Sequence, residues 1–222
     1  MDTKRQSILR TPIILLAVFN LVVLAVRLWP WQEAMNLPGN GTIGIDPAIA
    51  LAGYIGLGLW IGTARKDSSR KLLFSAAWLG VLAGVFLVAQ VVLRTRQAAE
   101  DAMAGSERVV ILVCAAIVLG FAGLRAARAG HGPGFSAVCA IWASMMACLM
   151  AVAAVLGETY LSQAQNESSD PWKDYQGLAI GTPAMQALAN SLNTVSGFLL
   201  IGPVVGCVIG ALFAWFGGPK KA

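Results

Sequence analysis

Six apolar runs separated by polar segments dominate the pattern along the 222 residues of the chain. Hydrocarbon offers no hydrogen-bond partners to a bare backbone, so an apolar run of about 20 residues is typical of a membrane-spanning helix. The pattern therefore predicts an all-α fold, a polytopic transmembrane helical bundle of about six helices that forms one integral membrane domain over residues 1–222. The predicted spans are 11–29, 48–64, 72–93, 109–124, 135–157 and 195–216.

The predicted spans are uneven. The second and fourth are short, so either each gains a turn from the residues before it or both are thin spans among longer neighbours. The longest polar segment, 158–190, is predicted to be an outer loop. Thr182-Pro183 resembles an N-cap followed by proline at the first helical position, which predicts that the last helix begins near residue 183. Pro203 predicts a kink in that helix, because proline removes one backbone hydrogen bond.

The positions of the charged residues predict the orientation. Of the 16 lysines and arginines, 11 fall on the side of the N-terminus if the chain crosses six times. Cytoplasmic loops carry such an excess, so both termini are predicted to be cytoplasmic in a multi-pass protein of the cell membrane. The apolar run that follows Arg10 ends in Arg27-Leu28-Trp29-Pro30, which lacks a small-residue cleavage site and predicts an uncleaved first span.

Composition narrows the partners and cofactors. Apolar residues make up 57% of the chain and charged residues only 12%, far from the usage of soluble domains. The net charge of +5 comes from short basic clusters between apolar runs, so we expect the lipid bilayer as a partner and no nucleic acid. The four cysteines lie in apolar runs without a CxxC pair, and His131 is the only histidine. We therefore expect neither a metal site nor a haem, and no other cofactor.

Glycines at four-residue spacing are the clearest local motif. Such spacing places them on one helix face, where a second backbone can approach closely. One interpretation is close packing inside a single bundle, and the other is an interface with a second copy or with another membrane protein. The motif occurs in the second, third and last spans, as Gly58 and Gly62, as Gly80 and Gly84, and as Gly202, Gly206 and Gly210.

Polar residues at membrane depth are few. Asn20, Gln90 and Asn193 are candidates for lining a cavity. No aspartate, glutamate, lysine or histidine lies near the centre of a predicted span, which argues against a proton relay. Ser144 has no histidine nearby in the sequence to activate it, and we identify no catalytic residue.

Two further patterns lead to weaker expectations. Aligning Trp78 with Trp142 matches five other residues over 74–91 and 138–155, which suggests that the second and third spans repeat as the fourth and fifth. We also expect these two tryptophans, together with Trp60, to fill the interior of the bundle.

Three classes of function are compatible with this pattern. The first is a non-enzymatic membrane component, a subunit or scaffold that assembles through glycine-rich helix faces. The second is a small-solute transporter or channel for neutral or apolar cargo, favoured by the kink and by the polar candidates. The third is an intramembrane enzyme, for which the sequence offers no reacting group.

Overall fold

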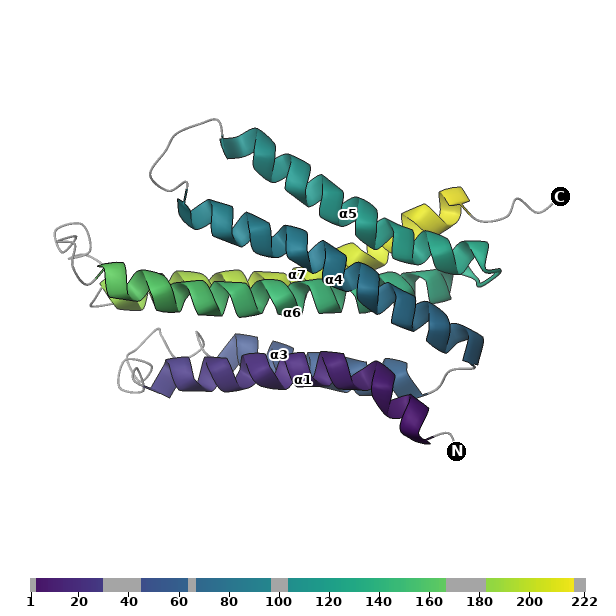
Figure 1. Ribbon diagram of the computed structural model, residues 1–222, viewed down its shortest axis with the longest axis horizontal. Helices are drawn as coiled ribbons and strands as arrows, with labels where there is room; N and C mark the ends of the chain where they lie inside the picture. The colour runs from purple at the N-terminus through teal and green to yellow at the C-terminus, as the bar shows by residue number, and fades with distance from the viewer. Residues whose placement is uncertain (1–2, 30–44, 64–66, 97–103, 167–182, 218–222) are drawn as a thin grey trace.

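The computed structural model describes residues 3–29, 45–63, 67–96, 104–166 and 183–217. These residues form six helices and no strand. The helices run side by side along one axis, in alternating directions, and α1 begins at the same end of the bundle as that at which α7 ends (Figure 1). The helices are α1 (Thr3–Leu28), α3 (Ile45–Thr63), α4 (Asp67–Arg96), α5 (Ala104–Arg128), α6 (Pro133–Asn166) and α7 (Pro183–Gly217).

Four of these helices are long and apolar enough to cross a membrane, which makes the chain a helical membrane protein by length and composition. They cover Ser69–Leu93, Ser106–Arg128, Pro133–Glu158 and Asn190–Gly217. The apolar parts of α1 and α3 are shorter and cover Thr11–Val26 and Ile45–Ile61. The segment predicted as the short fourth span extends back to Ala104, and α3 extends back to Ile45, so both gain the additional residues expected of them.

Two predicted boundaries can be compared directly with the structure. The last helix begins at Pro183, as predicted from Thr182-Pro183. The predicted end of the fifth span at residue 157 lies within one residue of the end of the apolar span at Glu158, and α6 continues beyond it for two more turns to Asn166. Residues 158–166 contain neither glycine nor proline, and polar helix formers such as Gln163 sustain a helix beyond the apolar run. Hydropathy therefore marked the end of the apolar span and not the end of the helix.

The connection between α5 and α6 is a compact turn. The amide of Gly130 donates to the carbonyl of Ala127 at 3.0 Å, and the amide of His131 donates to the carbonyl of Ala126 at 3.2 Å. These bonds form a Schellman motif, which requires a left-handed residue at its centre. Gly130 fulfils this requirement with a φ of 80°, and α6 then begins at Pro133.

Helix α6 is the centre of the bundle. It packs against α7, α4, α5 and α1, and more sparingly against α3. In Figure 1 the hairpin of α4 and α5 lies on one side of the α6–α7 pair, and α1 and α3 lie on the other. Within its span 72% of α6 is buried, against 22–33% for α4, α5 and α7. The core therefore forms around one helix, whereas the other spans present much of their apolar surface outward.

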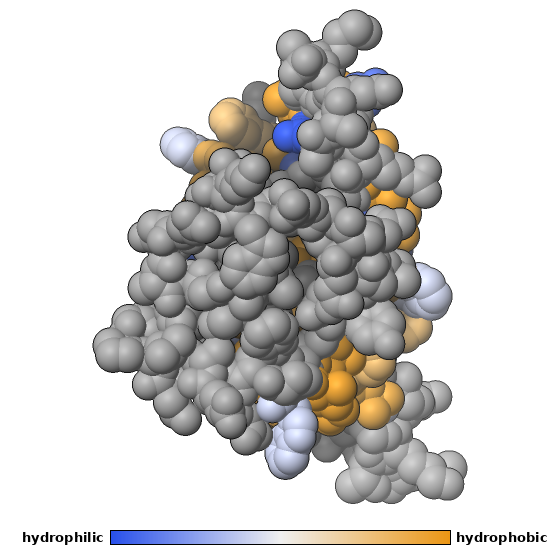
Figure 2. Space-filling view, turned by 90° about the vertical axis from the view of Figure 1, so that its left-hand side faces the viewer, coloured by the Kyte–Doolittle hydropathy of each residue, from blue (hydrophilic) through white to orange (hydrophobic). Residues whose placement is uncertain are grey.

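The outward faces carry large apolar side chains, as expected of helices that contact lipid. Figure 2 looks onto the end of the bundle opposite the start of α1, and hydrophobic residues are visible along its flanks. Trp60 and Trp78 are 66% and 63% exposed, so the expectation that they fill the interior was wrong. Only Trp142 of the three is buried. Amphipathic aromatic rings also occur on the outer surface of a span. Hydropathy alone does not show whether a tryptophan lies there or inside the bundle.

The suggested duplication is not reflected in the packing. Helix α5 lies along α6, whereas α3 makes almost no contact with α4. The aligned tryptophans, Trp78 and Trp142, also differ in environment, one outward and the other in the core. Alanine-rich spans resemble one another by composition, and the two hairpins are not equivalent in the structure.

Candidate functional site

The glycines of α7 bring its backbone against α6. A Cβ atom added at Gly206 would lie 2.5 Å from the Cβ of Ser144, and one at Gly202 would collide with the sulfur of Cys148. A Cβ atom added at Gly210 would likewise collide with the Cβ of Ala140. The residues of α6 that face these glycines also recur every four positions, so two small-residue faces interlock.

The glycines of α4 let this helix pack closely against a second face of α6. A Cβ atom at Gly80 would lie 2.8 Å from the Cβ of Met146, and one at Gly84 would lie 3.3 Å from the Cα of Ala147. Two faces of α6 are therefore filled by glycine-bearing helices of the same chain. This geometry supports packing inside one bundle over an interface between copies for the glycines of α4 and α7.

In the N-terminal hairpin, Gly58 of α3 faces α1, and a Cβ atom there would lie 3.3 Å from Cγ2 of Ile13. Gly62 also lies in α3, but its surroundings fall outside the described residues.

Two more close contacts were missed by the search at four-residue spacing. Gly120 of α5 faces the ring of Phe213, and a Cβ atom at Gly123 would lie 2.7 Å from the carbonyl oxygen of Gly210. Since these two glycines are three residues apart, only a search for both helical spacings would have found them. Gly210 consequently lies where α5, α6 and α7 meet.

Four buried polar side chains lie near the middle of their helices: Asn20 in α1, Tyr54 in α3, and Ser144 and Cys148 in α6. The amide nitrogen of Asn20 donates to the carbonyl of Leu149 at 3.0 Å and to that of Leu16 at 2.9 Å. The side chain thereby ties α1 to α6, while its Oδ1 has no hydrogen-bond partner. We call these four residues the mid-span polar cluster.

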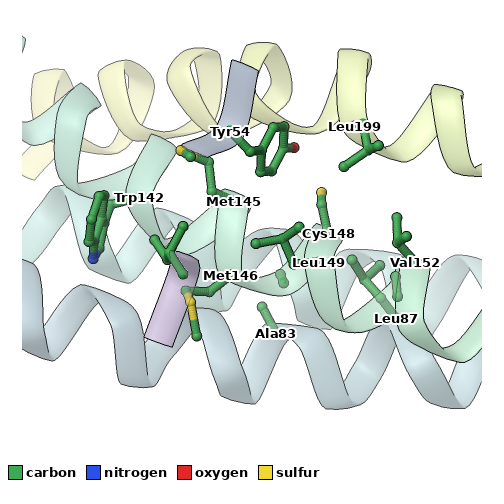
Figure 3. Close-up of a cluster of buried hydrophobic side chains, with 14 of the residues drawn as sticks. Tyr54, Ala83, Leu87, Trp142, Met145, Met146, Cys148, Leu149, Val152 and Leu199 are labelled. Carbon is green, nitrogen blue, oxygen red and sulfur yellow. The ribbon is translucent and has the colours of Figure 1, made fainter. Parts of the chain in front are cut away.

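Ser144 and Tyr54 extend this cluster to the neighbouring helices. The hydroxyl of Ser144 donates to the backbone carbonyl of Gly202 in α7 at 2.6 Å. Tyr54 is 3% exposed, and its hydroxyl lies beside the thiol of Cys148, as Figure 3 shows. That hydroxyl makes no hydrogen bond of regular geometry. Sequence reading singled out Asn20 but missed Tyr54 and Cys148, because only the rotation of α3 and α6 about their axes brings them together.

The other candidate polar residues are located elsewhere. Gln90 is half-buried on α4 and its Oε1 has no partner, whereas Asn193 is exposed on α7. Asn193 precedes Pro203 by ten residues, which corresponds to about 15 Å along a helix. The three candidate cavity-lining residues thus lie on three different helices, α1, α4 and α7.

Pro203 lies inside α7, which runs as one helix from Pro183 to Gly217. Proline has no amide hydrogen, so the carbonyl of Leu199 loses its regular helical donor. The bond from Ser144 reaches α7 one residue before this proline. A contact from α6 therefore supports α7 at the point where its own hydrogen bonding is interrupted, and the kink angle stays a prediction.

One glycine-rich face is not covered by the chain itself. Gly53 and Gly56 of α3 have no atom within 4 Å of the position a Cβ would take, and both are exposed together with Ala52. The other open glycines in the described spans are Gly134, Gly157 and Gly197, and none of them has a second glycine of the same helix one turn away. We call Ala52, Gly53 and Gly56 the open face of α3.

Within the described residues, no group of three His, Cys, Asp or Glu side chains is placed to hold a metal ion. The chain has no match among protein-family models, curated proteins or solved structures. The features of the chain that bear on its function are therefore the bundle, the mid-span polar cluster and the open face of α3.

Proposed function

We propose that the chain is a non-enzymatic component of the cell membrane that crosses the bilayer six times, with both termini in the cytoplasm, and assembles with a second copy through the open face of α3. The observation that carries this proposal is the contrast between glycines. Another helix of the same chain packs against Gly80 and Gly84 of α4 and against Gly202, Gly206 and Gly210 of α7, whereas Gly53 and Gly56 have no atom of the described residues within 4 Å of a Cβ position.

A glycine inside a membrane span lowers the stability of the helix unless a contact compensates for it. Glycine is a poor helix former, and inside a span it is favourable mainly where its missing side chain lets another helix approach. Ala52 and Gly56 are four residues apart, so they form a small-xxx-small face on the outside of the bundle. Ile49 and Trp60, each 66% exposed, flank this face. The open face is thus a patch of small residues between two large exposed side chains.

A second copy is the occupant that this face fits best. Two copies inserted in the same orientation are related by a twofold axis along the membrane normal, which places the same face of α3 on both sides of the contact. Small residues then meet small residues, as in the helix pairs that glycine motifs form in membranes. Helix α3 packs mainly against α1 and α7, so its outer side is accessible to a partner.

The number of crossings and the orientation rest on separate support. The apolar parts of α1 and α3 are 16 and 17 residues long, which is enough for a thin span flanked by polar residues. Helix α1 begins at the same end of the bundle as that at which α7 ends (Figure 1), as an even number of crossings requires. The excess of lysine and arginine at that end favours the cytoplasm.

The side chains of the core support a non-enzymatic role. Among the described residues, the buried polar groups include one asparagine, four serines, the phenol of Tyr54 and the thiols of Cys139 and Cys148, without a carboxylate, a basic side chain or an imidazole. Such groups hydrogen-bond helices to one another but cannot exchange protons at neutral pH.

The test is the mass of the protein in a mild detergent or a lipid nanodisc. Static light scattering should give twice the chain mass of 23.2 kDa for the wild type. Gly53→Leu and Gly56→Leu should reduce it to one chain, because a leucine side chain prevents the close approach of a second helix. Gly197→Leu, at an open glycine of another helix, is the matched control and should leave two chains per particle. A single chain in the wild type, or equal masses for all variants, would overturn the proposed assembly.

A small-solute transporter for neutral or apolar cargo is the second candidate. The observation that favours it is the pair of unpartnered polar atoms, Asn20 Oδ1 and the Tyr54 hydroxyl, in the middle of the bundle. Flux of neutral solutes into proteoliposomes above that of empty liposomes would establish this function, and no flux for any of them would exclude it for those solutes.

A further inference from the structure

Two unpartnered polar atoms lie in the middle of the bundle on neighbouring helices. Asn20 of α1 is 0% exposed and Tyr54 of α3 is 3% exposed, yet among the described residues neither Asn20 Oδ1 nor the Tyr54 hydroxyl makes a hydrogen bond of regular geometry. Burying such a group without a partner is unfavourable, because the group loses its hydrogen bonds to water. Two of them in one place call for an explanation.

The register between α1 and α3 shows that these atoms share a level. Ile13 of α1 contacts the backbone at Gly58 of α3. The two helices are antiparallel neighbours (Figure 1). A step of four residues toward the C-terminus of α1 therefore matches a step of four toward the N-terminus of α3, and Ala17 lies level with Tyr54. Asn20 is then less than one turn away, about 4.5 Å along the axis.

Both side chains also face the same turn of α6. Asn20 donates to the carbonyl of Leu149, and the Tyr54 hydroxyl lies beside the thiol of the preceding residue, Cys148. Figure 3 shows Tyr54 and Cys148 directed toward one another among buried apolar side chains. The two unpartnered atoms therefore lie on neighbouring helices at a similar level of the bundle, next to consecutive residues of α6.

The chemistry of the two atoms defines what would fit between them. Asn20 Oδ1 can only accept a hydrogen bond, and the Tyr54 hydroxyl can donate one. A hydroxyl group offers both functions at a single oxygen atom. Among the described residues the core contains no charged side chain, so an ion would lack a counter-charge.

We propose that Asn20, Tyr54 and Cys148 form a mid-membrane binding site for the hydroxyl group of a small neutral molecule. The occupant is either a water molecule or the hydroxyl of a small neutral solute, which share this chemistry. Buried waters typically make about three hydrogen bonds to polar groups of this kind. The site does not depend on assembly through α3, and it supplies the transporter candidate with a cargo class.

The direct test is hydroxyl-radical labelling by X-ray pulses of the wild type in nanodiscs, read by mass spectrometry at residue 54. Water bound beside a buried ring yields radicals in place, so we expect label on Tyr54 although the ring is shielded from bulk solvent. Tyr54→Phe is the matched control, because it keeps the ring and removes the hydroxyl, and it should lose the label. An unlabelled Tyr54 in the wild type would overturn the site, whether or not the variant folds.

A second measurement distinguishes the two sources of the hydroxyl. Proteoliposomes are exposed to a glycerol gradient and their swelling is followed by light scattering. Swelling above empty liposomes that is lost in Tyr54→Phe identifies a solute hydroxyl as the occupant. Labelled Tyr54 without such swelling identifies water. Thermal unfolding provides an independent check, since Tyr54→Phe lowers the midpoint only if the hydroxyl has a partner.

Discussion

The hydroxyl of Ser144 in α6 donates a hydrogen bond of 2.6 Å to the backbone carbonyl of Gly202 in α7. The contact is short because Gly202 and Gly206 have no side chains to hold the two helices apart. It joins the most buried helix of the protein to the helix that contains Pro203. Packing and hydrogen bonding thus reinforce one another at the same place.

Removing this hydroxyl should weaken the α6–α7 contact. Ser144→Ala is expected to lower the free energy of unfolding by about 1 kcal/mol, the usual size of an interhelical hydrogen bond in a membrane protein. Unfolding by SDS in mixed micelles measures the change. Ser196→Ala, at a half-buried serine of α7, is the matched control with a change near zero. Equal effects of the two substitutions would show that the Ser144 bond does not contribute.

The glycines of α7 allow a comparison within one helix. Gly206→Ala places a Cβ 2.5 Å from the Cβ of Ser144, whereas Gly197→Ala places one in open space. Overpacking should make the first variant less stable by about 1–3 kcal/mol. The second should stay within about 0.5 kcal/mol of wild type. Thermal unfolding of both variants in the same detergent tests this, and tolerance of alanine at position 206 would contradict the close approach of α6 and α7.

Asn20 should anchor the N-terminal hairpin to α6. Asn20→Ala removes the bond to the carbonyl of Leu149, and we expect a loss of about 1–2 kcal/mol because that contact crosses between helices at membrane depth. Asn193→Ala changes an exposed asparagine and serves as the control, with stability unchanged. If both variants and the wild type unfold at the same SDS concentration, the hydrogen bond of Asn20 does not stabilise the fold.

The orientation can be tested with single cysteines. Asp46 is exposed at the start of α3, and Gly132 is exposed between α5 and α6. With both termini in the cytoplasm, a membrane-impermeant maleimide should label Asp46→Cys in intact cells and label Gly132→Cys only after permeabilisation. The unmodified chain controls for the native cysteines. The reverse pattern would place the termini outside.

Part of this architecture could be predicted from the sequence, for local reasons. Apolar runs marked the helices, and Thr182-Pro183 marked the start of α7, because each signal lies within a few neighbouring residues. The end of α6 at Asn166 was missed because polar helix formers continue the helix beyond the point at which hydropathy falls. Glycine spacing identified helix faces suited to close packing. It did not show which helix would occupy each face.

The candidate sites depended on relations between distant residues. The cluster of Asn20, Tyr54 and Cys148 exists because α1, α3 and α6 are rotated so that these side chains face one another, and nothing local in the sequence specifies that rotation. The open face of α3 likewise becomes visible only once the neighbours of every other helix are known. Local patterns gave the elements, and packing determined which of their faces are occupied.

Disulfide cross-linking along α3 in native membranes tests the proposed assembly most directly. Single cysteines are introduced at exposed positions of α3 from Ile49 to Trp60, with Val113→Cys on the exposed face of α5 as the control. Mild oxidation should produce cross-linked dimers most strongly at Ala52, Gly53 and Gly56, and none at position 113 beyond the unmodified chain. Cross-linking that is absent from α3, or equal at all positions, would contradict assembly through this face.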